Sequence, residues 1–140
     1  MFLQIVLVLL VLSCSVGLAQ AEWIEITRSS SDQVTIYADP TTYRFDKKSG
    51  LVKMWILYDF KKARTFNQPS RVSYLSARMQ KQFDCKEGRY RLLATDYFVG
   101  NMLTDEIVDS FYTEENKWQP VARGTIAKTE WNVACGTAKP

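Results

Sequence analysis

The chain of 140 residues contains no histidine, and this absence removes much of the common catalytic chemistry. Without an imidazole there can be no Ser-His-Asp or Cys-His nucleophile and no histidine-ligated zinc. The sequence also has no Ser-x-x-Lys motif, no P-loop and no Gly-x-Gly-x-x-Gly run. Its cysteines are too few for a four-ligand structural zinc site. The sequence therefore predicts no catalytic residue, no metal site and no cofactor.

Paired carboxylates are the remaining route to catalysis, as in glycoside hydrolysis. The candidates lie in expected loops or at strand ends, and no apolar sequence surrounds them to form a pocket. They are Asp105, Glu106, Asp109, Glu114 and Glu115. We interpret them as solvated surface groups and predict that the protein is not an enzyme.

The net charge of +3 is too small to suggest a nucleic-acid partner, but the charges are separated along the chain. Six basic residues and no acid lie between Asp59 and Asp84, and six acids and no base lie between Leu92 and Asn116. One interpretation is a basic loop that contacts an acidic partner, such as an anionic protein, an anionic polysaccharide or a lipid headgroup. Its candidate contact residues are Lys61, Lys62, Arg64, Phe66 and Arg71. The alternative is that these charges pair with the acidic segment of the same molecule.

The first 21 residues have the pattern of a signal peptide. An apolar run covers Phe2–Leu12, and Ala19-Gln20-Ala21 is a small-x-small cleavage site. The run is short for a membrane span. We expect an exported domain of residues 22–140, in the periplasm or at the cell surface. Two alternatives stay open, because Val11–Cys14 resembles a lipobox that would anchor the protein through a lipidated Cys14, and because the segment could stay uncleaved.

Removal of Cys14 with the leader would leave Cys85 and Cys135 as an even pair in an oxidising compartment. A bridge between them would close a loop of about 50 residues, which is worth roughly 4 kcal/mol in the chain-entropy model. The alternative is two free, buried thiols.

A long hairpin is the strongest secondary-structure signal. Odd positions from Leu75 to Cys85 are mostly apolar and even positions are polar, which is typical of a strand with one buried and one solvated face. This pattern places Asp84 on the solvated face, beside the turn. Lys86-Glu87-Gly88 can make that turn because Gly88 tolerates a positive φ, and a second run follows from Tyr90 to Thr95.

Other β-rich runs flank this hairpin. The most apolar is Leu51–Phe60, which we expect inside the sheet because both of its faces are apolar in the middle. The segment Lys61–Ser70 is predicted to be a loop. The remaining expected strands are Glu22–Arg28, Gln33–Ala38, Tyr43–Asp46 and Ile107–Tyr112.

The period changes to a helical one in Thr125–Cys135, where apolar residues recur at i, i+4, i+7 and i+8. Thr125 is the expected N-cap and Gly136 the expected C′ residue. The helix should place Trp131 on the sheet and Cys135 beside Cys85. Glu130 lies within the apolar arc and should find a basic partner. The predicted fold is α+β, an antiparallel sheet of about six strands with one C-terminal helix packed on it and a single disulfide.

An ordered set of short motifs, spread over nearly all of the chain after the leader, resembles the surface-adhesin protein E family of small exported bacterial proteins. They are Trp23, Tyr37-Ala38-Asp39-Pro40, Val52-Lys53-Met54-Trp55, Tyr58-Asp59-Phe60, Phe83-Asp84-Cys85, Arg89-Tyr90-Arg91, Trp118-Gln119-Pro120 and Trp131–Cys135. The resemblance implies an antiparallel sheet with a C-terminal helix, and a disulfide between Cys85 and Cys135.

The same resemblance implies adhesion to host extracellular-matrix and serum proteins, and haem binding is also attributed to the adhesin. Since this chain has no histidine, haem would need a Tyr, Met or Cys ligand. We therefore expect a non-enzymatic binding module without a cofactor. The alternative function is that of a structural or accessory protein of the periplasm.

Overall fold

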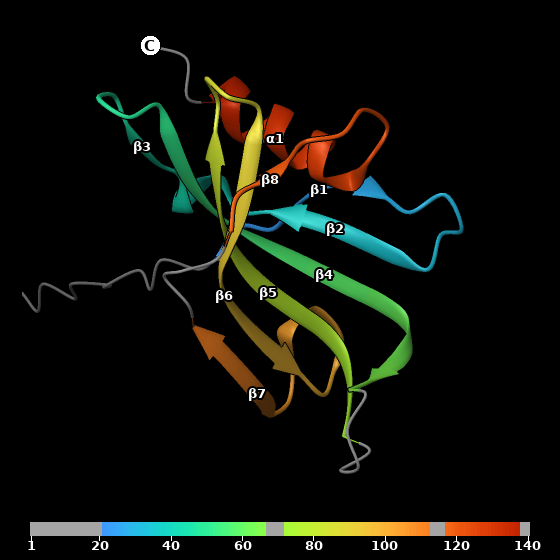
Figure 1. The fold of residues 1–140 in the computed structure, drawn as a ribbon. Helices are drawn as coiled ribbons and strands as arrows, with labels where there is room; N and C mark the ends of the chain where they lie inside the picture. The colour runs from blue at the N-terminus through green and yellow to red at the C-terminus, as the bar shows by residue number, and fades with distance from the viewer. Residues whose placement is uncertain (1–20, 67–71, 113–116, 138–140) are drawn as a thin grey trace, which may run out of the picture.

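The fold is one twisted antiparallel sheet with a single helix against it (Figure 1). It is seen in a computed structural model that describes residues 21–66, 72–112 and 117–137. The strands follow the order β1-β2-β4-β5-β6-β7, while β3 pairs with β4 and β8 with β6. The elements are β1 Ile24–Arg28, β2 Val34–Ala38, β3 Arg44–Asp46, β4 Leu51–Thr65, β5 Ser73–Asp84, β6 Arg89–Phe98, β7 Ile107–Tyr112, β8 Gln119–Pro120 and α1 Ile126–Thr137. The α+β prediction is confirmed: six strands make the main path and two short ones extend it.

The core lies on the side of the sheet that carries α1, here called the helix face. Alternate residues of β4 point into it, and Val52, Met54 and Ile56 are almost completely buried there. The helix contributes Ala134 and Trp131 to the same cluster. Strand β4 lies inside the sheet, as predicted, with β2 and β3 along one edge and β5 along the other. The opposite side of the sheet, here called the free face, is lined by the intervening residues of β4 and β5.

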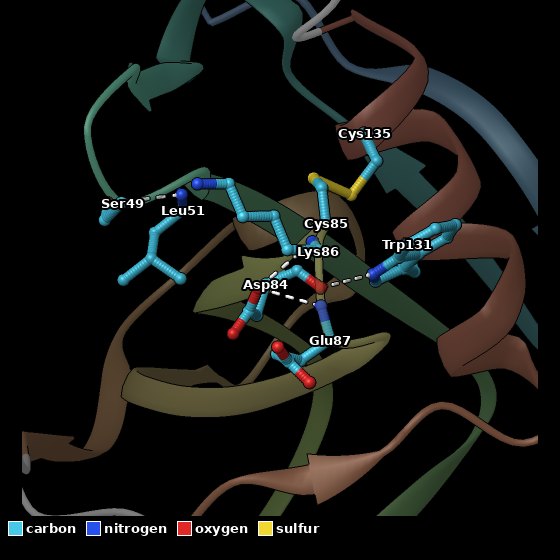
Figure 2. Close-up of a disulfide and its surroundings, with 8 residues drawn as sticks. All are labelled: Ser49, Leu51, Asp84, Cys85, Lys86, Glu87, Trp131 and Cys135. Atoms are coloured by element: carbon cyan, nitrogen blue, oxygen red, sulfur yellow. Dashed lines mark hydrogen bonds between the residues drawn. A yellow bond between two sulfur atoms is a disulfide. The ribbon is translucent and has the colours of Figure 1, made fainter.

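The disulfide joins the end of β5 to the last turn of α1, as Figure 2 shows. The two cysteines are 50 residues apart in sequence, and their Cα atoms are 5.6 Å apart. One helical turn before Cys135, the Trp131 Nε1–H donates to the backbone oxygen of Asp84 at 3.0 Å. The predicted bridge is thus confirmed, and it lies beside a hydrogen bond that fixes the same two elements.

The turn of the β5–β6 hairpin depends on Asp84. Its Oδ1 accepts the backbone N–H groups of Lys86 and Glu87 at 3.1 Å each, and its Oδ2 accepts from Arg89 Nε at 3.0 Å. Gly88 has a φ of +63°, as the turn requires. The prediction that Asp84 faces solvent is wrong, because these donors enclose the carboxylate and leave it 4% exposed. Burial raises its pKa, but the hydrogen bonds outweigh this effect and leave the pKa below its usual value.

Two predicted boundaries are also wrong. Residues Lys61–Thr65 belong to β4 and not to a loop, because β5 is long enough to pair again with Arg64 and Thr65 after an irregularity in register. Of the rest of the predicted loop, Phe66 directly follows β4, and 67–70 lie outside the described residues, as do Cys14 and the first two residues of the expected cleavage motif, Ala19 and Gln20. The helix continues through Gly136 to Thr137, so Gly136 is not the C′ residue. Thr125 is the N-cap, as expected, since its Oγ1 accepts the Lys128 N–H at 3.2 Å.

Candidate binding surfaces

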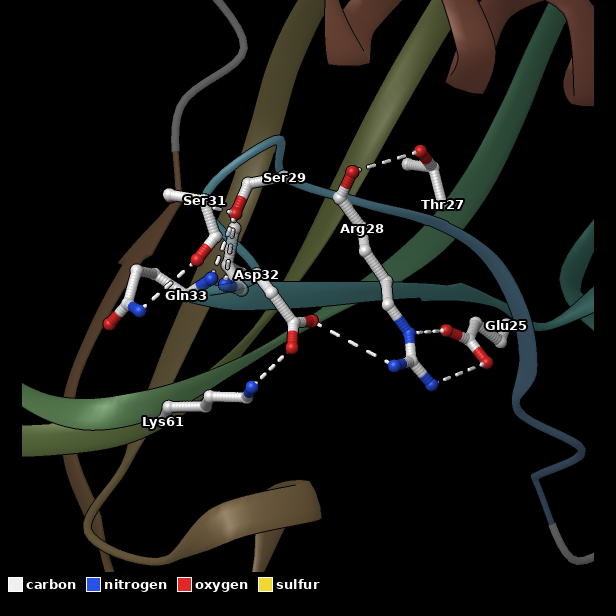
Figure 3. A network of polar contacts seen from close by, with 9 residues as sticks. Glu25, Thr27, Arg28, Ser29, Ser31, Asp32, Gln33 and Lys61 are labelled. Atoms are coloured by element: carbon white, nitrogen blue, oxygen red, sulfur yellow. Dashed lines mark hydrogen bonds and ion pairs between the residues drawn. The ribbon is translucent and has the colours of Figure 1, made fainter.

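The predicted basic residues gather at the end of β4, a region here called the basic strand end: Lys61, Lys62 and Arg64. Lys61 forms an ion pair with Asp32 in the β1–β2 turn, and Asp32 lies 3.8 Å from Arg28. Figure 3 shows this chain of charges, which ends where Arg28 contacts Glu25. The hydrogen bond from Lys61 and its charge lower the pKa of Asp32. The positive charge of Lys61 is therefore partly offset within the molecule.

Lys62 and Arg64 are exposed, and neither forms an ion pair within the described part of the chain. The Arg64 guanidinium lies over the Phe60 ring, 4.6 Å from its centroid. Pairing of β2 with β4 ends at Val34 and Phe60, so β4 continues with one edge open beyond Lys61. This end of the strand therefore presents two exposed cations that have no ion-pair partner among the described residues, beside a backbone edge that no described strand pairs.

Phe66, the aromatic member of the predicted set, packs within the molecule. Its ring centroid is 4.9 Å from that of Tyr74 and 4.8 Å from that of Tyr97. It is half-buried, so it stabilises the end of β4 and offers a partner only part of its ring. Arg71 lies outside the described residues.

A buried polar trio connects the helix to the sheet. Lys81 Nζ is 2.7 Å from Glu130 Oε2 and 2.9 Å from the Tyr58 hydroxyl, and this hydroxyl also donates to Glu130. The basic partner predicted for Glu130 is confirmed. Burial and the charge of Glu130 raise the pKa of Tyr58. Because Glu130 is completely enclosed, we assign the trio a structural role.

On the free face, an ion pair joins the basic segment of the sequence to the acidic one. Arg78 Nε donates to Asp96 Oδ2 at 2.7 Å, and Asp96 Oδ1 accepts from Ser110 at 2.6 Å and Tyr112 at 3.2 Å. Burial raises the pKa of Asp96, but these hydrogen bonds and the Arg78 charge outweigh it and lower the pKa. Pairing within the molecule, the alternative considered for the basic segment, thus holds for Arg78.

A hollow of about 520 Å³, here called the sheet hollow, also opens on the free face. It is lined by Lys53, Gln80, Gln82, Arg91, Leu93, Ala94 and Tyr112. A neighbouring hollow of about 310 Å³ shares Lys53 and Gln82 with it. Sequence reasoning missed this site. The alternation in β5 does place Gln80 and Gln82 on the polar face, but only the strand register brings Lys53 and Arg91 to either side of Gln82.

The carboxylates considered for catalysis do not form a metal-binding group in the described part of the chain. Asp105, Glu106 and Asp109 are exposed there, and no three His, Cys, Asp or Glu side chains gather to hold a metal ion. Glu114 and Glu115 lie outside those residues. In the same ranges no helix has the length and apolar character needed to cross a membrane.

Comparison with known proteins gives one family and one fold. A family model described as "Surface-adhesin protein E" matches residues 23–136. Two solved structures of Haemophilus influenzae protein E are similar, each with 13% sequence identity. One has a TM-score of 0.60 and covers 85% of this chain and 87% of its own, and the other has 0.61 with 84% and 77%. No curated protein matches the sequence.

Proposed function

Because the chain belongs to the surface-adhesin protein E family, we propose that it is an exported, non-enzymatic binding module that contacts acidic extracellular macromolecules through the basic strand end. The observation that carries this proposal is the pair of exposed cations at Lys62 and Arg64, which have no ion-pair partner among the described residues and lie where β4 runs beyond β2. Lys61 adds a third cation that an acidic partner could attract away from Asp32.

The exposure of these cations indicates which kind of anion they bind. Charges at the surface interact weakly one at a time, and salt screens them over about 10 Å at 0.1 M. A cluster of three therefore attracts an extended anion, such as an acidic polysaccharide or an acidic region of a matrix or serum protein, better than a small ion. Phe66 would contribute only an edge of its half-buried ring.

The binding test compares two triple variants in retention on immobilised heparin. Changing Lys61, Lys62 and Arg64 to Ala should lower the salt concentration that elutes the protein. The matched control changes Lys47, Lys48 and Lys86 to Ala, which removes the same charge from exposed positions elsewhere. Equal loss in both variants would mean that only net charge matters, and no loss in the first would refute a role for the basic strand end.

Export itself is part of the proposal. We propose cleavage after Ala21, and lipidation of Cys14 is the competing route. The mass of the N-terminal peptide from the mature protein separates the two, since a chain beginning at Glu22 has lost Cys14 altogether.

The alternative function, a structural or accessory protein of the periplasm, is separated by protease treatment of intact cells. A surface adhesin is cut from outside, whereas a periplasmic protein is protected until the cells are lysed. Protection in intact cells would contradict the adhesin function and favour the alternative.

A further inference from the structure

We propose that the sheet hollow binds a short oligosaccharide carrying uronate carboxylates, with Arg91 and Lys53 as its two anion-binding groups. The hollow lies on the free face, across β4, β5 and β6, and does not include the basic strand end. This inference is independent of the function proposed above.

The guanidinium of Arg91 is preorganised to bind a carboxylate. Its Nε donates to Gln82 Oε1 at 2.8 Å, and its guanidinium lies 4.6 Å from the centroid of the Trp118 ring. Both contacts fix the plane of the group, and neither uses its terminal amino groups. In the described part of the chain these two amino groups have no hydrogen-bond partner, so both are available to a ligand. A planar fork of this kind matches a carboxylate with two parallel hydrogen bonds.

Lys53 supplies the second positive charge. Lys53 and Arg91 pair with Gln82 from opposite sides, so two interstrand spacings, roughly 10 Å, separate their backbones. The Lys53 side chain forms no ion pair or hydrogen bond within the described residues, and no acid lines the hollow. Two cations at this separation suit two acidic groups on one ligand better than a single one.

The remaining lining groups favour a sugar over an acidic peptide. Side-chain amides both donate and accept, as the hydroxyl groups of a sugar do, and Gln80 has no partner for its amide in the described ranges. The ring of Tyr112, fixed by its hydrogen bond to Asp96, offers an apolar surface for the C–H face of a sugar ring. A peptide would need an open strand edge or apolar pockets for its anchors. The floor of the hollow is formed where β4, β5 and β6 pair with one another through Lys53, Gln82 and Arg91, so these strands offer a peptide no open edge between them.

The test is calorimetric titration of the purified protein with a hyaluronan tetrasaccharide, which carries carboxylates and no sulfate. Binding should weaken as salt is added. A chitin-derived tetrasaccharide, which is neutral, should not bind. A tetraglutamate peptide tests the alternative ligand, an acidic peptide. Binding of the peptide in place of hyaluronan, or equal binding of the neutral sugar, would overturn the proposal, as would no binding of hyaluronan at low salt.

Variants then locate the site. Lys53→Gln and Arg91→Lys should each weaken hyaluronan binding about tenfold, in line with the loss of a hydrogen bond to a charged group. Gln80→Ala should weaken it less. The side chains of Lys53 and Gln80 contribute no hydrogen bond within the described residues, so both variants should fold normally. Lys47→Gln, the matched control at an exposed position outside both surfaces, should bind as the wild type does. Equal weakening by Lys53→Gln and Lys47→Gln would place the ligand elsewhere and overturn the assignment.

Discussion

At the scale of single residues, the buried ion pair between Lys81 and Glu130 has the largest predicted effect on stability. The side chain of Lys81 is 10% exposed and that of Glu130 is completely enclosed, so neither charge can be solvated if its partner is lost. Glu130→Ala should lower the free energy of unfolding by about 3–5 kcal/mol. Urea unfolding of the oxidised protein measures this loss.

The paired variant gives the control for that prediction. Changing Lys81 to Met and Glu130 to Leu together removes both charges, so the double variant should be more stable than Glu130→Ala alone. A double variant that is less stable than the single one would show that the two charges do not compensate each other.

Asp96 should make stability depend on acid pH. Its pKa is lowered in the folded protein, so its contribution is complete above the unfolded pKa of about 4 and is lost as the pH falls through the folded value. Asp96→Asn should cost about 2 kcal/mol at pH 7, where the carboxylate accepts hydrogen bonds from Arg78, Ser110 and Tyr112. The difference from the wild type should shrink at pH 3. Urea unfolding measures the free energy of unfolding of both proteins. An equal difference between them at pH 7 and pH 3 would contradict the stabilising role of the Asp96 carboxylate.

At the scale of secondary-structure elements, α1 depends on contacts made near Cys135. The disulfide, the Trp131–Asp84 hydrogen bond and the Lys81–Glu130 pair all connect this helix to β5. Isolated helices of 12 residues are marginal in water, so these contacts and the packing of Trp131 keep α1 formed.

Removing the bridge tests this dependence. The double variant Cys85→Ser and Cys135→Ser should lose roughly 4 kcal/mol, the value that the chain-entropy model gives for a loop of this size. Hydrogen exchange should accelerate most in α1 and least in β4 and β5. Uniform acceleration throughout the chain would mean that the helix and the sheet unfold together.

Much of this element-level architecture could be predicted from the sequence, because alternation and helical period report directly on burial. The hairpin, the position of α1, the basic partner of Glu130 and the disulfide are confirmed. The sequence did not predict that Lys61–Thr65 is part of a strand. These residues are exposed and mostly charged, so they show no alternation of apolar and polar residues. The sheet hollow was missed because it depends on register, which no local pattern specifies.

At the scale of the whole molecule, the basic strand end and the sheet hollow share no residue and no described ion pair. Variants in the two surfaces should therefore act independently. Combining Lys53→Gln with the triple change of Lys61, Lys62 and Arg64 to Ala should reproduce each separate binding defect and add no other. A combined loss in either assay that exceeds the separate losses would show that the two surfaces bind one continuous ligand.

The bridge between Cys85 and Cys135 also makes residues 85–135 a covalent ring that contains β6, β7, β8 and most of α1. One proteolytic cut anywhere inside this ring opens it but releases no fragment, because the sulfur–sulfur bond still joins the two pieces. On a gel without reducing agent the nicked protein would keep its full mass, and only a second cut within the ring or loss of the bridge would let a piece of this region diffuse away.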